Sequence, residues 1–555
     1  MTPEVEIEQL REVPELVGRI LAGRGMAAEE MKRFLWPEYA RDMNDPFLMT
    51  DMAAAVERIG LAAERGEQVV IYGDYDIDGI TASAVMIEGL RALGLEAESY
   101  IPDRFEEGYG INLEALQGLK ARGVNLVVSV DCGITSVAEA AWARDNGLDL
   151  VITDHHAVPE VIPEAIAAVN PKRPGDAYPF KELCGAGVAF KLVQALQVRT
   201  GKPAAGQEKW LLDLVALGTV CDVVPLVGEN RMLAAYGLKV MRKTRREGLR
   251  ALAEVAGVRI EQITSENLGF ALGPRMNAAG RLEHARHSLE LMLTQDPMRA
   301  AEIARELDDL NRKRRATQEA IYEAADKLAE GYSGDGVLVL ADKDWSQGVV
   351  GIVASKLMEK WQKPVLIAQV LGEYAKGSAR SVKGYSIVEA LRANSGLLER
   401  FGGHVFAAGF TLKTDRLEEF RAGINEHFAG QAELIEAAAE EEKADLEMDD
   451  LDPVDWGLLA ELDLLEPFGS GNSRPLIEVR GLRVNRLSRV GAEGKHLRLG
   501  LVDARGKHLA CIGFGLGTRY NELSEQDVVG VRGSLNKNVY QENTSLQLMV
   551  KEILM

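Results

Sequence analysis

Carboxylate and imidazole side chains recur in this chain directly after short apolar runs. The run 70–73 is followed by three aspartates at alternate positions, Asp74, Asp76 and Asp78. Later segments add groups of the same kind: Asp131, then Asp154, His155 and His156, then Asp222. Oxygen and nitrogen donors of this type are the ligands that Mg²⁺ and Mn²⁺ accept. Their delivery by separate segments predicts one composite site and a hydrolase built around two metal ions.

Two other interpretations of the first acidic run were considered. Residues 74–79 match the opening of an EF-hand calcium loop, which also needs a glutamate at its twelfth position. Val85 occupies that position, and the run follows a predicted strand rather than a helix, so we exclude a calcium loop. A carboxylate after a strand can instead be the nucleophile of an aspartyl-phosphate mechanism. The adjacent histidines His155 and His156 favour metal ligation over that mechanism.

The elements that position these groups alternate in type. We expect strands at 68–73, 96–101, 126–130, 149–153 and 166–170, with helices such as 81–94 and 135–146 between them. This alternation is typical of a parallel sheet covered by helices. Ligands of such sheets lie beyond the carboxyl ends of the strands. Asp74, Asp131 and Asp154 all follow such ends, as a shared site requires.

The rest of the chain predicts a multidomain protein. Residues 298–330 carry one helical pattern, which at about 1.5 Å per residue spans roughly 50 Å and connects two domains. A second α/β unit follows, with strands near 337–340 and 364–367, and five short strands after 475 favour an OB-type barrel. The expected domains are an N-terminal segment 1–50, a catalytic α/β domain 51–295, the helix 296–332, an α/β domain 333–430, an acidic helical linker 431–474 and the barrel 475–555.

The charge of the chain is uneven. The net charge is −21, from 64 basic and 85 acidic residues, which argues against a uniformly basic surface for nucleic acid. Residues 431–452 hold ten acids and one lysine, whereas residues 480–555 hold twelve basic residues against seven acids. The charge therefore does not exclude a nucleic-acid substrate, and the basic C-terminal stretch favours one.

Two further features bear on location and binding. The four cysteines form no CxxC pair, no apolar run approaches the roughly 20 residues of a membrane helix, and the N-terminus lacks a signal-peptide pattern. We therefore expect a reduced, cytoplasmic protein without membrane contact.

The densest basic run, 242–246, has two open interpretations: the solvated end of a helix, or a strip that tracks DNA.

The ordered motifs of the chain resemble those of the DHH phosphoesterase superfamily and, within it, the RecJ family of bacterial single-strand-specific exonucleases. The resemblance covers nearly the whole chain and is carried by the segments 74–79, 101–104, 108–110, 130–133, 153–156, 221–225, 273–281 and 402–404. It implies a parallel-sheet DHH domain, a long helix, a DHHA1-type α/β domain and a C-terminal OB-like β-barrel.

The resemblance also implies roles for individual residues. The implied metal ligands are Asp76, Asp78, Asp131, His155 and Asp222, with Asp131 bridging two divalent cations, Mn²⁺ or Mg²⁺. Asp74 and His156 are implied as catalytic supports that orient ligands or contact the phosphate. Many superfamily members have histidine where this chain has Tyr72. This departure bears on the coordination of the first metal ion and offers a reason for the presence of Asp74.

Substrate contacts are expected from arginines, small residues and one aromatic ring. Arg104 and Arg275 suit bidentate phosphate contact, and Tyr109, between two glycines, suits stacking on a base. The remaining candidates, which the resemblance places on the far wall of a substrate cleft, are Asn277, Arg281, Ser378, Arg380 and His404.

The activity implied by the resemblance is hydrolysis of single-stranded DNA from its 5′ end to 5′-mononucleotides by a two-metal mechanism, in recombination and repair. Implied partners are single-stranded DNA with a 5′ end, a single-strand-binding protein and a RecQ-type helicase, and the protein is expected to be a monomer. Two rivals stay open: a small-substrate phosphoesterase of the nanoRNase or 3′-phosphoadenosine phosphatase type, and an inactive replication scaffold.

Overall fold

The computed structural model describes residues 12–104, 106–108, 110–332, 336–431, 435, 443–540 and 543–555. The chain divides into two compact units. The first comprises Met1–Pro102, Glu107–Gly273 and Lys443–Met555, and the second comprises Asp103–Glu106 and Pro274–Glu442. In the described residues, no helix combines the length and apolar character that crossing a membrane requires.

A five-stranded parallel sheet forms the centre of the first unit. Its order is β2 (Ala97–Tyr100), β1 (Val69–Gly73), β3 (Leu126–Val130), β4 (Asp149–Thr153) and β5 (Ala167–Val169). The predicted strands and their parallel arrangement are confirmed. Because β1 has β2 on one side and β3 on the other, the strand order reverses between β1 and β3, and ligands of such sheets bind beyond the carboxyl ends of the strands at this point.

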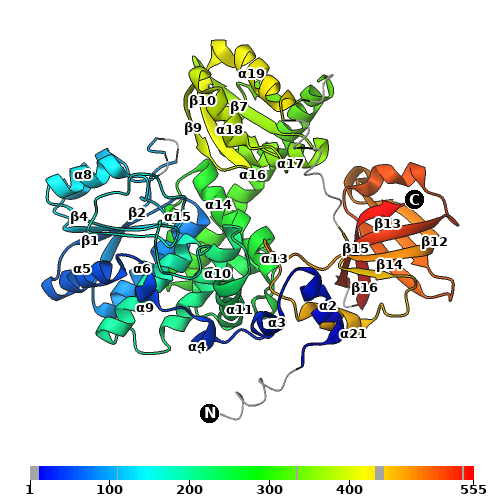
Figure 1. The fold of residues 1–555 in the computed structure, drawn as a ribbon, viewed down its shortest axis with the longest axis horizontal. Coiled ribbons are helices and arrows are strands. Elements are labelled where there is room, and N and C mark those ends of the chain that lie inside the picture. Colours follow the sequence, from blue (N-terminus) through cyan, green and yellow to red (C-terminus); the bar gives the residue numbers. More distant parts are fainter. Residues whose placement is uncertain are drawn as a thin grey trace. The chain divides into compact units, whose positions relative to one another are not determined.

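Helices cover both faces of this sheet. On one face, α7 (Leu113–Ala121) and α8 (Val137–Asp145) enclose a core with inward residues of β1, β3 and β4. Figure 1 shows α8 on one side of the sheet and α5 (Met52–Arg65) and α6 (Ile77–Leu93) on the other. The strands are buried on both faces, which explains their nearly continuous apolar sequences.

A helical layer follows the sheet in sequence. It contains α9 (Gly185–Thr200), η2 (Glu208–Leu211), α10 (Leu212–Cys221), α11 (Gly228–Met241), α12 (Glu247–Val255), η3 (Ile260–Gln262), α13 (Ser265–Asn267) and η4 (Leu268–Leu272). The helices α9 and α10 pack against α6, and α11 packs back along α10. This packing brings the start of α9 and the end of α10 to the beginning of α6, where the acidic run lies.

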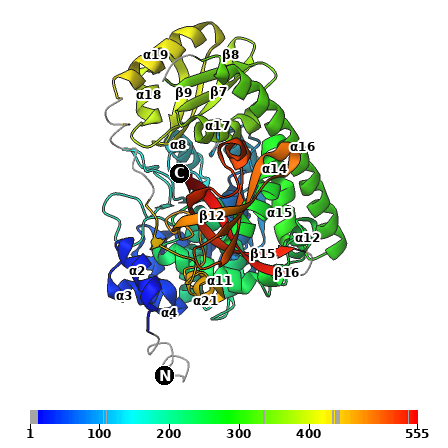
Figure 2. The same ribbon diagram turned by 90° about the vertical axis from the view of Figure 1, so that its right-hand side faces the viewer.

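The second unit contains the long helix and a mixed sheet. After α14 (Gly273–Leu282) and α15 (Arg286–Leu293), α16 runs from Pro297 to Glu330 as one continuous helix, as predicted (Figure 2). The sheet order is β6 (Leu338–Asp342), β7 (Val365–Leu371), β8 (Tyr374–Arg380), β10 (Ala407–Lys413) and β9 (Leu398–Gly403). Its helices are α17 (Gln347–Trp361), α18 (Ile387–Ala393) and α19 (Leu417–Ala429).

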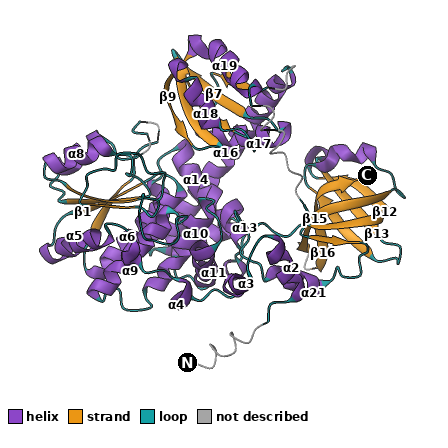
Figure 3. Ribbon diagram, in the orientation of Figure 1, coloured by secondary structure: helices purple, strands orange, loops and turns teal. Residues whose placement is uncertain are grey.

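The C-terminal strands close into a barrel, coloured as strands in Figure 3. They are β12 (Ile477–Val490), β13 (His496–Val502), β14 (His508–Gly513), β15 (Val528–Tyr540) and β16 (Asn543–Leu554). They pair in the order β12–β13–β14–β16–β15, and β15 pairs again with β12. The OB-like barrel is therefore confirmed. A short strand, β11 (Leu446–Met448), pairs with β12 upstream of the expected start at 475.

Helices near the N-terminus share a core with this C-terminal part. Apolar residues of α2 (Glu15–Gly23) and α3 (Ala28–Leu35) pack with those of α21 (Trp456–Asp463) and the barrel. The Arg231 side chain, 2% exposed, donates hydrogen bonds to the carbonyl oxygens of Phe34 at 2.6 Å, Leu465 at 3.0 Å and Glu466 at 2.8 Å. A buried guanidinium thus joins α11 to segments from both ends of the chain.

Candidate metal centre

The acidic run forms a tight turn between β1 and α6. Asp74, 3% exposed, follows the last residue of β1. Asp76 caps α6, since its Oδ1 accepts hydrogen bonds from the backbone N–H groups of Asp78 at 2.9 Å and Gly79 at 3.1 Å. A Cβ on Gly79 would lie 2.5 Å from the carbonyl oxygen of Asp74, so glycine is required there. The turn therefore fixes three carboxylates around one helix start.

Asp78 is buried against the start of α9. Its carboxylate, 1% exposed, accepts hydrogen bonds from the backbone N–H groups of Gly185 at 2.6 Å and Ala186 at 2.9 Å. Burial and the neighbouring Asp76 nevertheless raise the pKa of Asp78 to about 6. The helix end thus orients this carboxylate, while the surrounding negative charge keeps it short of full ionisation when no cation is present.

Asp131 lies at the centre of the acidic cluster. It follows β3 with a φ of 60°, and its side chain is 2% exposed. Burial, followed by the charges of Asp78 and Asp76, raises its pKa well above the usual range. A Cβ on Gly185 would lie 2.5 Å from the Asp131 carboxylate, so α9 approaches Asp131 as closely as only glycine permits. The structure therefore concentrates negative charge that the protein itself does not neutralise.

The two histidines at the end of β4 have different environments. His155 Nε2 lies 3.1 Å from Asp131 Oδ1 and 3.7 Å from a carboxylate oxygen of both Asp78 and Asp222. Burial and the neighbouring His156 lower the pKa of His155 to about 3, so its imidazole is neutral. His156 is held by Asp154, whose Oδ1 lies 2.8 Å from His156 Nδ1. One histidine therefore faces the carboxylates, and the other is oriented by a buried carboxylate.

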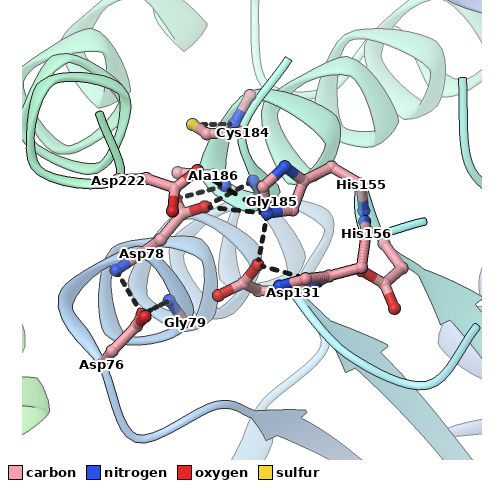
Figure 4. A network of polar contacts seen from close by, with 12 residues as sticks. Asp76, Asp78, Gly79, Asp131, His155, His156, Cys184, Gly185, Ala186 and Asp222 are labelled. Carbon is pink, nitrogen blue, oxygen red and sulfur yellow. Dashed lines mark hydrogen bonds and ion pairs between the residues drawn. The ribbon is translucent and has the colours of Figure 1, made fainter. Parts of the chain in front are cut away.

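Asp222 completes the cluster from the end of α10. It is the C-cap of that helix, its side chain is 22% exposed, and the chain then turns through Val223 with a φ of 63°. Burial, then Asp78 and Asp76, raises the pKa of Asp222. Figure 4 shows Asp78, Asp131, Asp222 and His155 pointing toward a common centre.

The donors fit divalent cations. They form three groups, each with one ligand atom per residue and all such atoms within 4.8 Å of one another: Asp74, Asp76 and Asp131; Asp78, His155 and Asp222; Asp131, His155 and His156. Asp131 Oδ1 and His155 Nε2 are both buried without a hydrogen bond among the described residues. Buried ligand atoms without a hydrogen bond, next to carboxylates of raised pKa, are what a pair of bound cations would satisfy.

Tyr72 has a structural role in this chain. Its ring is fully buried and stacks on Tyr100, with ring centroids 5.0 Å apart. Its hydroxyl donates a hydrogen bond to the carbonyl oxygen of Gly110 at 3.1 Å. The group of Asp74, Asp76 and Asp131 therefore offers three carboxylates, and Tyr72 is not part of it.

Several expected substrate contacts gather in the second unit, around the first half of α17. Arg380 on β8 donates hydrogen bonds to Ser355 Oγ at 3.1 Å and Ser378 Oγ at 2.9 Å. A Cβ on Gly351 would lie 3.0 Å from Ser378 Oγ. Arg281 donates to the carbonyl oxygen of Gly348 at 3.1 Å, at the start of the same helix. These residues therefore lie around the first half of one helix, and their role in binding substrate stays a prediction.

The other candidates are less closely grouped. Arg275 donates a hydrogen bond to Asp308 at 2.9 Å, and Asp308 also pairs with Arg312, so Arg275 has a carboxylate partner on α16. Asn277 and Arg104 are half-buried, and His404 is exposed in the turn between β9 and β10. Tyr109 lies outside the described residues.

Two contributors to the centre, Gly185 and Lys172, were not expected from the sequence, and the structure adds a role for Asp154, which was expected at the end of its strand. Asp154 orients His156, and its place within the Asp-His-His run is the signal that indicates it. Gly185 admits Asp131, and the small residues that open α9 indicate such a close approach. Lys172, whose charge offsets part of the rise in the pKa of Asp222, follows β5 and had no signal in the sequence. Its backbone N–H donates to buried Asn170, which in turn donates to the carbonyl oxygen of His156.

Comparison with known proteins supports the same architecture. Residues 68–219 match the DHH family N-terminal domain, residues 334–430 the DHHA1 domain, and residues 444–552 the RecJ OB domain. The single-stranded-DNA-specific exonuclease RecJ of Bacillus subtilis is 37% identical over 548 residues, covering 98% of this chain and 68% of that protein. The protein of the same name from Escherichia coli is 36% identical over 436 residues, with 75% of each chain covered.

Solved structures agree with these sequence relatives. The crystal structure of RecJ from Thermus thermophilus in complex with Mn²⁺ matches with a TM-score of 0.83 at 30% identity, covering 100% of this chain and 78% of that one. A structure of the same protein with Mg²⁺ matches with a TM-score of 0.77. Together with the closed barrel, these matches show that the chain belongs to the RecJ exonuclease family and combines its DHH, DHHA1 and OB domains.

Proposed function

We propose that this protein is a metal-dependent exonuclease that hydrolyses single-stranded DNA from the 5′ end and releases 5′-mononucleotides. The observation that carries the proposal is the convergence of Asp78, Asp131, His155 and Asp222 beyond the carboxyl ends of β1, β3 and β4, with buried donor atoms left unsatisfied. The named activity of the family relatives supports it.

The proposed division of the donors follows their grouping. Asp74, Asp76 and Asp131 hold one divalent cation, and Asp78, His155 and Asp222 hold the other, with Asp131 close to both. Two such ions, when bound, supply Lewis acidity toward the scissile phosphate and lower the pKa of water. Neutral His155 keeps its nitrogen lone pair available as a ligand, since its pKa is lowered to about 3.

The protein groups around the donors orient the reaction. His156 is 33% exposed, unlike His155, and its ring is fixed by Asp154, so it is placed to contact a phosphate oxygen. Hydrogen bonds from Gly185 and Ala186 hold the Asp78 carboxylate in a single orientation. Fixed donors of this kind are effective because they need no reorganisation during the reaction.

The barrel is proposed as a platform for the strand downstream of the cleaved end. Phe514 is 59% exposed and meets His496 edge-on, with ring centroids 5.1 Å apart. The guanidinium of Arg489 lies 5.0 Å from the ring centroid of Tyr520. Exposed rings beside cations are typical of surfaces that stack unpaired bases.

One digestion tests the function. Single strands and duplexes labelled at either end are incubated with Mn²⁺, Mg²⁺ or EDTA. We expect the 5′ label of single strands to be released first, as a mononucleotide, while duplexes resist and EDTA abolishes release. Earlier release of a 3′ label would contradict the polarity. Turnover restricted to very short oligonucleotides would instead indicate a small-substrate phosphoesterase.

The cluster around α17 makes a second prediction about the 5′ end. Arg380 is half-buried with hydroxyl and carbonyl partners but no carboxylate partner among the described residues, so an anion completes its environment. Arg380→Ala should lower kcat/KM for 5′-phosphorylated strands by about 10-fold or more, because charged hydrogen bonds contribute about 1.5–3 kcal/mol. The exposed Arg392, paired with Glu389, is the control. An unchanged preference for 5′-phosphate over 5′-hydroxyl would show that Arg380 does not bind the 5′-phosphate.

Action in recombination and repair, a cytoplasmic location, a monomeric state, and partnership with a single-strand-binding protein and a RecQ-type helicase stay predictions of the family resemblance.

A further inference from the structure

One outer surface of the catalytic domain combines cations with aromatic rings, and we call it the basic–aromatic surface: Tyr39, Lys209, Trp210, Tyr236, Lys239 and Arg245. Lys209 lies 4.5 Å from the ring centroid of Tyr39, Lys239 lies 4.6 Å from that of Tyr236, and Arg245 lies 4.6 Å from that of Trp210. The two tyrosine rings are themselves in contact, with centroids 5.9 Å apart. Three cations thus rest on three rings, and Lys209 and Trp210, which are adjacent in η2, link the two tyrosine pairs to the Trp210–Arg245 pair along the chain.

The positive charge of this surface is not neutralised by the protein. Lys209, Lys239 and Arg245 are exposed, and none of them forms an ion pair within the described part of the chain. The nearby Glu208 is 4% exposed and accepts hydrogen bonds from Tyr39 and Gln197 instead. In a chain with a net charge of −21, an uncompensated basic surface is unusual.

The surface also resolves the basic run 242–246 into two kinds of residue. Arg246 is buried between Glu88 and Asp213, and Arg242 donates a hydrogen bond to the carbonyl oxygen of Ile263. Lys243 and Arg245, in contrast, are exposed. Arg242 and Arg246 are therefore structural, whereas Arg245 belongs to the basic–aromatic surface.

This surface is separate from the metal centre. Lys209 and Trp210 belong to η2, directly before α10, whereas Asp222 follows the last residue of α10. A helix of 10 residues separates them by about 15 Å along its axis. The helix α11 runs back along α10, and Lys239 lies in its last turn, so all three cations lie at the end of this helix pair that is remote from Asp222.

We propose that the basic–aromatic surface binds the phosphate backbone of a nucleic-acid strand as an accessory contact, distinct from the cleavage site and from the barrel. The proposal rests on the proposed function, because it assumes a polymer substrate. Exposed lysine and arginine side chains bind phosphates through charge and counterion release, and their stacking on rings restricts them in advance. Trp210, 40% exposed, adds one ring edge for a base.

An acidic protein segment is the less favoured occupant. Protein partners usually bury an apolar anchor in a pocket at the centre of the interface. Here the three rings already carry cations on their faces, and the surface offers charge rather than an apolar pocket. Binding of an acidic segment is therefore one of the outcomes that the experiment below distinguishes.

The test removes the three charges together, by Lys209→Ala, Lys239→Ala and Arg245→Ala, in the full chain. The matched control removes three arginines of the same unit that are paired with carboxylates: Arg91, Arg122 and Arg144. Both variants change the net charge equally. A charge-preserving variant (Lys209→Arg, Lys239→Arg, Arg245→Lys) controls for folding, together with the melting temperature of each protein.

Binding is measured for single strands of about 10 and about 60 nucleotides over a range of salt concentrations, with cleavage blocked by Asp131→Asn. The triple alanine variant should bind the long strand about 10-fold more weakly, and its slope of log affinity against log salt should fall by about 2, since each lost contact removes about 0.7. The short strand, the paired-arginine control and the charge-preserving variant should be unaffected.

Suppose the triple alanine variant keeps the long-strand affinity and salt slope, and the same variant with Asp131 intact cleaves the short strand at the normal rate. This result would overturn the proposal while leaving the exonuclease function intact. Loss of binding to a polyglutamate peptide without loss of DNA binding would also overturn it and assign the surface to acidic protein segments. Absence of strand turnover in the unmodified protein would instead reject the proposed function itself.

Discussion

Replacing Asp131 with asparagine should abolish strand cleavage, by about 10³-fold or more, without unfolding the protein. Asp131 belongs to one of the two proposed metal groups, and its Oδ1 lies 3.1 Å from His155 Nε2 of the other, so its loss affects both proposed metal positions. Asparagine is the appropriate substitution because it tolerates the φ of 60° at this position. Steady-state cleavage of labelled single strands with Mn²⁺ measures the effect.

The same variant should change stability in the opposite direction to activity. Buried Asp131 stands among other carboxylates, and these charges raise its pKa. Removing one of them relieves repulsion, so the melting temperature in EDTA should equal or exceed that of the unmodified protein, while the stabilisation produced by Mn²⁺ should shrink. The exposed acid Asp145 supplies the control, Asp145→Asn. Cleavage retained by Asp131→Asn with Mn²⁺ would reject the two-metal assignment.

Removing divalent cations should destabilise the protein more at pH 7.5 than at pH 5. The folded-state pKa of Asp78 is raised to about 6 from an ordinary 3.8, so its contribution to metal-free stability is present below about pH 4 and is lost as pH rises through about 6. Asp131 and Asp222, whose pKa values are also raised, act with the same sign. Bound cations remove this loss because they require ionised ligands.

His155 acts with the opposite sign in part of this range. Its pKa is lowered to about 3 from an ordinary 6.5, so it contributes stability that is lost as pH falls between those values. Three raised carboxylates outweigh one lowered imidazole, and the metal-free free energy of unfolding should therefore fall overall from pH 5 to pH 7.5. Denaturant unfolding with EDTA or with Mn²⁺ at both values measures this. A metal-free protein that gains stability across that range would contradict the acidic-cluster account.

Local sequence was enough to predict the metal centre's elements. Asp74, Asp131 and Asp154 each end a strand of continuous apolar sequence, and parallel strands bring their carboxyl ends to one edge. The start of α9 was not predictable in this way. The bond from Gly185 to Asp78 joins residues 107 positions apart, and nothing in either segment alone indicates that partner.

The partners of charged side chains were harder to predict than the order of helices and strands. Arg275 was expected to contact phosphate, which stays a prediction, and its ion pair with Asp308 depends on how α14 packs against α16. The basic run 242–246 allowed two interpretations because its residues alternate between a buried ion pair and an exposed surface, as Arg246 and Arg245 show. The role of an arginine is decided by the acid that tertiary packing brings to it, and the sequence around it does not contain that information.

The shared core of α2, α3, α21 and the barrel has a consequence for how the chain is made. Arg24 near the N-terminus pairs with Asp445, 421 positions later. At about 5–20 residues per second, ribosomal synthesis delays that partner by roughly 20–80 s. During this interval Ile20, Leu21 and Leu35 lack the apolar side chains that bury them in the finished protein. The earliest helices to leave the ribosome are thus among the last to be buried, and a nascent chain that stalls before residue 445 would present an adhesive apolar surface to chaperones.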